Sequence, residues 1–366
     1  MPNIQEIITF NYVQKREYLL FFVNPMKIVL YLLLLFIITP AFAQVGGERI
    51  YNFLNITTSA HQAALGGETL TIQDDVNQAL WNPATITRYM DNQAALSYVN
   101  YLTDVSMGSA TFAHLINRNF GVLHGGIQYV NYGEFIAADE NGFETGTFTA
   151  RDLAISVGYA YNIAWTNFYV GSNVKFLSSK IENYTSHGAA VDLGIYYFSD
   201  NKPYSITAVV RNLGYQFTPY TEVREDLPLE IAVGASYKLT DVPLKWHVTI
   251  NNLQKWNIAV ANPSNNETDL EGNITTQDIN FFTNAIRHVV IGGEFFPGKG
   301  FNIRFGYNFR RAAELELTEA RTFAGISAGF GLKMGRMKLD YAYTKYHPAE
   351  NTSTFTLHID LTKRGF

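Results

Sequence analysis

Charged residues and histidines recur on one face of an alternating pattern after Gln93, and such groups can pair with each other or line an ion path. Positive and negative residues are mixed among them, whereas ion selection uses a ring of one sign. We therefore predict a structural polar network in the lumen of a closed sheet, with a selective ion pathway as the alternative. The residues assigned to this network are Asp192, Glu230, Lys238, His247, Glu294, Arg304, Lys338, Asp340, His358 and Asp360.

Catalysis would need a nucleophile, a base and an orienting group on one side of the sheet. Ser186 and His187 are neighbours, so in a strand their side chains point to opposite faces and cannot pair. The 8 histidines are dispersed without a His-x-x-x-His pair, and the chain has no cysteine. We predict that the protein is not an enzyme and that it has no catalytic residue, no dedicated metal site and no cofactor.

Large apolar residues alternate with small or polar residues from Gln93 to Phe366, most clearly over 229–239. This period of two indicates strands with one apolar and one polar face. A sheet in a bilayer must close on itself, because lipid solvates no unpaired backbone group. We predict an all-β membrane protein, an antiparallel transmembrane β-barrel of about 14 strands with an N-terminal plug. The strands are expected near 93–101, 105–115, 120–131, 149–163, 165–179, 186–199, 203–213, 228–239, 243–253, 286–297, 300–311, 321–333, 336–346 and 352–361.

The composition agrees with this class and narrows the range of partners. The chain of 366 residues contains 23 tyrosines and 26 phenylalanines, and such rings form the girdles at both membrane–water interfaces of a barrel. The alternative is a soluble β-sandwich with an aromatic core. A net charge of −5 argues against nucleic acid as a partner, because nucleic-acid binding requires a basic surface.

Connection lengths are expected to alternate, with short turns around Asn117, Ala164, Asn201, Asp241, Gly298 and Gly335 and longer links at 132–148, 180–185, 214–227, 254–285, 312–320 and 347–351; the first link, at 102–104, is short and is the one exception. Outer-membrane barrels have short periplasmic turns and long external loops. We therefore predict an outer-membrane location, periplasmic barrel termini and extracellular long loops. Aromatic residues in two of the loops are candidates for binding a protein partner, with membrane-girdle rings as the alternative. They are Tyr132, Phe135, Phe143, Phe148, Phe281 and Phe282.

The segment before the barrel divides into an export signal and a plug. Lys27 precedes an apolar run over 28–38, and a small-x-small motif follows at 41–43, so residues 1–43 are predicted to be a signal peptide with Met26 as the initiator. Residues 44–92 are predicted to form the plug, with a disordered leader as the alternative, and 93–366 the barrel. We expect a short strand at 68–72 and a short helix capped by Asp75. The plug motif comprises Gly66, Gly67, Asp74, Asp75, Trp81, Asn82, Pro83 and Ala84.

Two runs in the plug, SAHQAALGG and DDVNQALWNPA, resemble the FadL-like barrels, a family of outer-membrane proteins that includes channels for fatty acids and hydrocarbons. Longer runs resemble the PorQ-like proteins of the type IX secretion system of Bacteroidota. These runs are VGGERIYNFLNITTSAHQAALGG, GIQYVNYGEFIAADENGFETGTF, INNLQKWNI and RHVVIGGEFFPGKGFNIRFGYNFRR. The resemblance covers essentially all of residues 44–366.

The resemblance implies a non-enzymatic component of type IX protein secretion that anchors a surface partner of the cargo attachment complex. PorQ-like proteins are similar to the PorV-like shuttle barrels and assemble with PorU-like sortases and PorZ-like outer-leaflet proteins. The implied surroundings are outer-membrane lipid and lipopolysaccharide, to which that complex attaches cargo. The plug runs alone imply the alternative, a FadL-like channel for fatty acids or other hydrophobic small molecules.

Overall fold

The computed structural model describes residues 49–117, 120–261, 267–268, 274–275, 279–316, 323–347 and 350–362. The predicted signal peptide, residues 1–43, lies outside the described residues, as do residues 44–48 of the predicted plug. Arg49 to Phe366 belong to a single compact unit of the chain.

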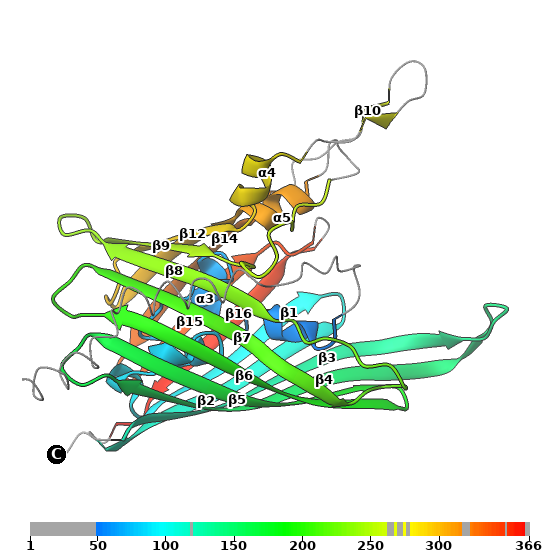
Figure 1. Ribbon diagram of the computed structural model, residues 1–366, viewed down its shortest axis with the longest axis horizontal. Coiled ribbons are helices and arrows are strands. Elements are labelled where there is room, and N and C mark those ends of the chain that lie inside the picture. Colours follow the sequence, from blue (N-terminus) through cyan, green and yellow to red (C-terminus); the bar gives the residue numbers. More distant parts are fainter. Residues whose placement is uncertain are drawn as a thin grey trace, which may run out of the picture. The chain divides into compact units, whose positions relative to one another are not determined.

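Fourteen antiparallel strands close into a barrel in which each strand pairs with its neighbours along the chain and the first pairs with the last (Figure 1). The predicted fold class is thereby confirmed. The strands are β1 (Gln93–Leu102), β2 (Val105–Asn117), β3 (Gly121–Ala138), β4 (Glu144–Asn162), β5 (Phe168–Ile181), β6 (Tyr184–Phe198), β7 (Tyr204–Thr218), β8 (Glu230–Lys238), β9 (Leu244–Ile250), β12 (Val289–Phe295), β13 (Phe301–Asn308), β14 (Ile326–Met334), β15 (Met337–Thr344) and β16 (Thr352–Asp360). Two-residue strands β10 (Glu267–Thr268) and β11 (Ile274–Thr275) pair within the β9–β12 connection.

The two faces of the barrel wall follow the period of two in the sequence. In β8, Glu230 and Ser236 are buried and face the lumen, whereas Val233 and Tyr237 lie on the outer face. Exposed apolar side chains such as Leu96 and Ile127 continue this outer face around the barrel. A closed antiparallel sheet with an apolar outer face is the architecture of outer-membrane barrels. Among the described residues, no helix is long and apolar enough to cross a membrane.

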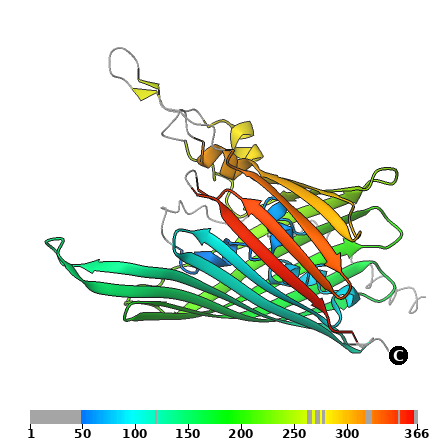
Figure 2. The same ribbon diagram turned by 180° about the vertical axis from the view of Figure 1, so that it is seen from behind.

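The β3–β4 hairpin is longer than the sequence pattern predicts. The predicted loop at 132–148 is mostly strand, because β3 continues to Ala138 and β4 begins at Glu144. A register shift between Asn131 and Glu134 interrupts the pairing, and beyond it most side chains on both faces are exposed. Alternation appears in a sequence only where one face is buried, so this extension gave no signal. Figure 2 shows the hairpin running past the ends of the neighbouring strands.

Three other predicted connections at the same end of the barrel also differ. The link predicted at 180–185 is a tight turn between Ile181 and Tyr184, in which Glu182 has φ 53°. Two short helices that the sequence analysis did not predict, α4 (Phe281–Ile286) and α5 (Phe309–Glu314), lie in the connections before β12 and after β13. The strand predicted at 300–311 ends at Asn308, because the Asn308 side chain accepts a hydrogen bond from the Arg311 amide and begins α5.

The plug occupies the lumen as a series of short turns and helices. They are η1 (Asn52–Asn55), α3 (Ala60–Ala64), η2 (Val76–Leu80), η3 (Pro83–Thr85) and η4 (Arg88–Met90). Asp75 caps η2 as predicted, by accepting a hydrogen bond from the Asn77 amide at 2.8 Å. The prediction of a strand at 68–72 is wrong. A closed barrel offers this segment no free strand edge, so side chains from the plug bind its carbonyl groups: Gln62 and Gln78 both donate to Thr69, at 3.1 and 2.9 Å.

Lumen-facing glycines of the wall allow the plug backbone to approach closely. A Cβ atom added to Gly171 of β5 would overlap the Pro83 carbonyl group, and one added to Gly306 of β13 would overlap the Gly66 amide. Similar contacts surround Gly194 of β6, which faces Asn82 and Ala84. The glycine positions therefore match the shape of the plug and leave no room for a side chain between plug and wall.

Replacing Gly171 with alanine should lower the free energy of unfolding by about 1–3 kcal/mol, because the added methyl group displaces the η3 backbone from the wall. The measurement is urea unfolding in lipid vesicles, together with protease sensitivity of the plug. Gly125→Ala is the matched control, because a Cβ atom there has no neighbour within 4 Å. Its effect should stay within about 0.5 kcal/mol. Equal effects at both glycines would contradict close docking of the plug.

Candidate functional site in the lumen and at the long-loop rim

Arg304 is the centre of a buried ion network on the inner wall. Its Nε lies 2.9 Å from Glu294 Oε1 and its Nη1 lies 2.7 Å from Asp340 Oδ1. The three residues come from β13, β12 and β15, so the barrel register brings together charges that are far apart in the sequence. His358 of β16 joins the group through Nε2, 2.9 Å from Asp340 Oδ2.

Plug residues extend this network from the wall into the lumen. Lys338 Nζ lies 3.5 Å from Asp74 Oδ2 and 3.4 Å from Asp340 Oδ2. His61 of α3 is buried, with Nε2 at 3.4 Å from Glu294 Oε1 and Nδ1 at 4.0 Å from Asp74 Oδ1. Asp75 Oδ1 lies 3.8 Å from His358 Nδ1. The plug and the wall therefore contribute to one network of acidic residues, basic residues and histidines.

A second ion cluster lies in the lumen on β5–β8. Lys175 Nζ is 2.6 Å from Asp192 Oδ2 and donates to Asn212 Oδ1 at 2.9 Å. Arg211 forms an ion pair with Glu230, and its Nη2 donates to the Leu54 carbonyl of the plug at 2.8 Å. The guanidinium also lies over the Trp81 ring, 3.7 Å from its centre. This cluster connects the wall to the plug at Leu54 and Trp81.

The predicted polar residues thus form two ion clusters, but not all of them take part. His247 hydrogen-bonds to Thr71 of the plug through Nδ1 at 2.7 Å. Lys238 forms no ion pair within the described part of the chain. Asp360 Oδ1 caps the backbone at Thr362, outside both clusters. The sequence analysis missed Lys175, Arg211 and the plug residue His61, whose partners only the folded structure identifies.

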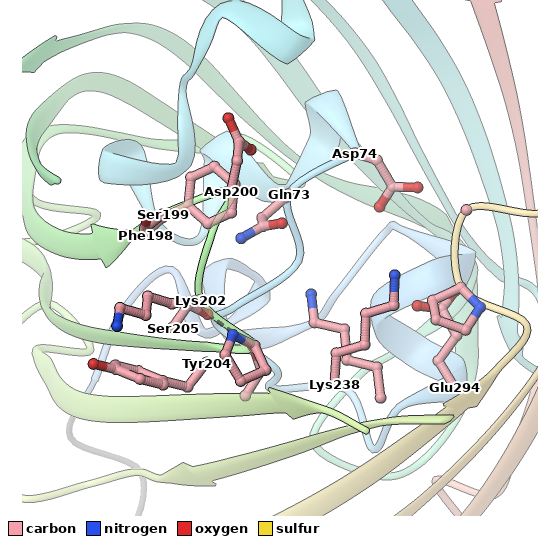
Figure 3. Close-up of a pocket in the computed structure, with 15 residues that line it drawn as sticks. Gln73, Asp74, Phe198, Ser199, Asp200, Lys202, Tyr204, Ser205, Lys238 and Glu294 are labelled. Atoms are coloured by element: carbon pink, nitrogen blue, oxygen red, sulfur yellow. Dashed lines mark hydrogen bonds between the residues drawn. The ribbon is translucent and has the colours of Figure 1, made fainter. Parts of the chain in front are cut away.

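Lys238 instead faces a pocket of about 300 Å³ between the plug and β6–β9 (Figure 3). Figure 3 shows Gln73 and Asp74 of the plug on one side of the pocket and Lys238 and Glu294 of the wall on the other. Turn residues Asp200 and Gly298 also line it. The pocket therefore lies at the end of the barrel that has the short turns, which we call the short-turn end.

The residues of the predicted plug motif all contact the wall or shape the plug. Gly66 and Gly67 have φ of 103° and 92°, values that favour glycine, and Asp74 and Asp75 belong to the ion network. Asn82 Nδ2 donates to the Leu70 carbonyl and to Thr207 Oγ1, both at 2.9 Å. Trp81 packs against the Arg211 guanidinium, and Pro83 and Ala84 contact the wall glycines.

An apolar layer fills the lumen near the opposite end, which carries the longer connections and which we call the long-loop rim. Phe53 and Leu54 of η1 form a buried cluster with wall residues that include Val99, Met107 and Val130. The plug's own side chains therefore occupy the apolar part of the lumen. Burial of this layer contributes to holding the plug in place.

The rim aromatics differ in how they are presented. Tyr132 is half-buried, and its hydroxyl donates to Asp152 Oδ2 at 2.6 Å. It therefore belongs to the wall, whereas the sequence analysis placed it among the candidate anchors of an outer loop. Phe135 and Phe148 stack with ring centres 5.2 Å apart on the extended hairpin, and Phe143 at its tip is 71% exposed. Phe148 follows the lumen-facing alternation of β4, so the stacked pair faces the space over the barrel mouth.

Helix α4 presents a second aromatic group at the rim. Phe281 stacks on Trp256, with ring centres 5.1 Å apart, and Phe282 meets Phe281 edge to face at 5.7 Å. Both phenylalanines are exposed, Phe282 to 80%. Stacking on Trp256 holds Phe281 in position, and the residue is still 64% exposed.

One Gly-x-Ser-x-Gly run, at 325–329, matches the nucleophile motif of many hydrolases, and the sequence analysis missed it. Ser327 is buried inside β14 and donates to the Ala64 carbonyl at 3.1 Å. The hydrolase motif requires a strand–turn–helix bend that exposes the serine, which a strand interior does not provide.

Ser186 and His187 point to opposite faces of the wall: Ser186 bonds to Tyr51 in the lumen, whereas His187 stacks on Phe176 on the outer face. Within the described residues, no group of three or more acidic or histidine side chains is arranged to hold a metal ion.

Comparison with solved structures finds other barrels. The toluene transporter TbuX of Ralstonia pickettii is 13% identical, with a TM-score of 0.47 and coverage of 84% of this chain and 97% of that chain. A mutant of the monoaromatic hydrocarbon channel TodX is 12% identical, with a TM-score of 0.43 and coverage of 82% and 96%. The KdgM porin is 5% identical, with a TM-score of 0.32 and coverage of 74% and 99%. No protein-family model and no curated protein matches the sequence.

Proposed function

We propose that this protein is a non-enzymatic outer-membrane barrel that anchors a protein partner at the cell surface. The observation that carries the proposal is the β3–β4 hairpin, which extends beyond the barrel and presents the stacked pair Phe135 and Phe148. Aromatic side chains held rigidly beside polar residues are typical anchors of protein interfaces. Phe281 and Phe282 of α4 offer a second anchor at the same rim.

The filled lumen supports an anchoring function over conduction through the barrel. An ion pair joins Asp74 of the plug to Lys338 of the wall, Asp75 lies 3.8 Å from His358, and Arg211 binds the plug backbone at Leu54. Wall glycines such as Gly171 meet the plug backbone directly. Passage through the lumen would require breaking these contacts together, which is costly because buried charges would lose their partners.

The proposed partner is the cargo attachment complex of type IX secretion, with PorU-like, PorZ-like and PorV-like proteins as its members. The resemblance of the four long sequence runs to PorQ-like proteins supports this choice. In the proposed orientation the barrel termini and short turns are periplasmic and the long-loop rim is extracellular, beside outer-membrane lipid and lipopolysaccharide. The alternation of short turns and longer connections supports this orientation.

Replacing Phe135 and Phe148 with alanine should abolish most partner recovery from detergent-solubilised outer membranes, because truncating a central aromatic anchor costs about 2 kcal/mol or more. The measurement is quantitative mass spectrometry of proteins that copurify with the tagged barrel. The matched control is Phe168→Ala with Tyr197→Ala, an aromatic pair 5.1 Å apart on the outer face at the short-turn end. Recovery of the surface partners should be unchanged in the control.

A channel for hydrophobic small molecules, the activity named for TbuX and TodX, is the second candidate function. The apolar layer around Phe53 and Leu54 favours it, because such a layer would accommodate an apolar substrate if the plug moved. The same copurification experiment separates the two functions. Absence of any surface partner, together with impaired uptake of a fatty acid or toluene in a deletion strain, would replace the first proposal with the second.

A further inference from the structure

An apolar groove lies on the outer face of the barrel, over β13, β14 and β15, and has a volume of about 430 Å³. At its centre is a small residue, Ala328 of β14, which is opposite Phe305 of β13 and Tyr343 of β15 in the sheet register. The larger residues around this centre also include Phe301, Ile303, Phe330 and Tyr341. Small-molecule sites typically measure about 300–1,000 Å³, so the groove is large enough for part of a lipid.

The groove is elongated along the strands. Phe301 is the first residue of β13, at the short-turn end, and Phe305 lies further along the same face, at about 13 Å for the rise of a strand. The rings of Phe330 and Tyr341 pack with their centres 5.6 Å apart, and both line the groove. An elongated apolar groove on the lipid-facing surface of a barrel fits an acyl chain.

Two cationic residues lie at the short-turn end of this groove. Lys299 lies in the β12–β13 turn, just before Phe301, and Arg336 lies in the β14–β15 turn. Both residues are exposed, and within the described part of the chain neither forms an ion pair. The Asp360 amide donates to the Arg336 carbonyl at 2.8 Å, but the Asp360 carboxylate caps the Thr362 amide through Oδ1 at 2.9 Å. The apolar groove therefore ends beside two positive charges.

A second groove of similar size has no such cationic end. It lies on the outer face over β5–β8, includes Ala208 in its lining, and also measures about 430 Å³. Of the short turns at its end, 199–203 contains both Asp200 and Lys202, and Asp241 is the only charged residue of 239–243. An apolar groove on the outer face thus occurs twice, whereas a groove with an excess of positive charge at its end occurs over β13–β15.

We propose that the groove over β13–β15 binds an anionic glycerophospholipid, with an acyl chain against Ala328 and the phosphate group beside Lys299 and Arg336. Basic residues close to a membrane surface attract anionic headgroups. An added Cβ atom at the turn residues Gly298 and Gly335 has no neighbour within 4 Å, so a headgroup can approach both turns. The inference goes beyond the proposed anchoring function and rests only on the proposed orientation, in which the short-turn end lies in the periplasmic leaflet, the phospholipid side of the outer membrane.

The test is native mass spectrometry of the purified full-length protein in dodecyl maltoside, titrated with dioleoyl phosphatidylglycerol. We expect one lipid to bind saturably. Lys299→Gln with Arg336→Gln should weaken this binding about 20-fold, because each cation near the headgroup contributes about fivefold. Ala328→Leu should weaken it about fivefold, because the larger side chain displaces part of the acyl chain from the groove.

Each variant has a matched control. Lys180→Gln with Lys202→Gln removes two positive charges from exposed lysines outside the groove. Ala208→Leu makes the same apolar change in the second groove. Both controls should bind phosphatidylglycerol as the native protein does. Heat-modifiable mobility verifies that each variant is folded, and if Ala328→Leu does not fold, the charge variant and its control decide the outcome.

Dioleoyl phosphatidylcholine has the same acyl chains without a net negative charge, and it should bind more weakly than phosphatidylglycerol. Equal binding of the two lipids, or equal binding by the charge variant and its control, overturns the proposal. Preferential binding of lipid A also overturns it, because lipid A belongs to the other leaflet. The purified protein carries no surface partner, so failure of the anchoring function in the copurification experiment would leave this measurement unchanged.

Discussion

Arg304→Leu should lower the free energy of unfolding of the barrel by about 3–5 kcal/mol, because it removes the cation that two buried carboxylates share and leaves Glu294 without an arginine or lysine partner. Arg304 is fully buried, and it is the shared partner of Glu294 at 2.9 Å and Asp340 at 2.7 Å. Leucine fills a similar apolar volume near the backbone, so the loss of unfolding free energy comes mainly from the weakened pairing of the Glu294 and Asp340 carboxylates. The measurement is urea unfolding in lipid vesicles, followed by heat-modifiable mobility.

Arg310→Leu is the matched control for this substitution. Arg310 also contacts a carboxylate, Glu314, at 2.7 Å, but this pair lies on α5 with both side chains about a third exposed to solvent. Its loss should cost less than about 1 kcal/mol. In the Arg304→Leu background, Asp340→Asn should recover part of the stability by removing one stranded charge. Equal losses for Arg304→Leu and Arg310→Leu would contradict a network that depends on buried charge.

Val233→Arg should lower the free energy of unfolding by about 2–4 kcal/mol, because the charge would enter the lipid near the middle of the membrane. Val233 lies on the outer face of β8, opposite Ala208 of β7 and Ile250 of β9. The measurement is again unfolding in vesicles, which report the native membrane-inserted state.

Tyr237→Arg is the control on the same face of the same strand. Tyr237 is opposite Tyr204, the first residue of β7 at the short-turn end, where a cation reaches the interface at a cost of about 0–1 kcal/mol. The comparison therefore varies depth while keeping the strand and the face. A mild effect of Val233→Arg would mean that this residue faces the lumen, and that Glu230 and Lys238 face lipid.

The strands and their faces were largely predictable from sequence. The predicted strand at 352–361 is β16 (Thr352–Asp360), and the one at 93–101 is β1 (Gln93–Leu102). Lipid outside and polar groups inside impose a period of two on every residue of the wall, so the signal is local and repeated. The Asp75 cap was predictable for the same reason, because a cap involves only the following two or three residues.

Where neither face is buried, the sequence carries no such signal. The sequence pattern therefore predicts a loop for the outer part of the β3–β4 hairpin, although its backbone is paired from Glu134 to Ala138. Tyr132 was assigned to an exposed loop for the same reason, whereas its hydroxyl binds Asp152. Hydrogen bonding between strand backbones does not depend on a buried face, and only the paired structure reveals it.

The sequence by itself determined the barrel, the faces of its strands and the identity of most polar residues that line the lumen. The tertiary structure alone decided which of them meet: Arg304 joins Glu294 and Asp340, whereas Lys238 is left opposite Lys245. Alternation depends on each residue's own environment, but an ion pair depends on the register of strands and on the path of the plug between them. That path is set by close contacts with wall glycines such as Gly171, which bring together residues widely separated in the chain.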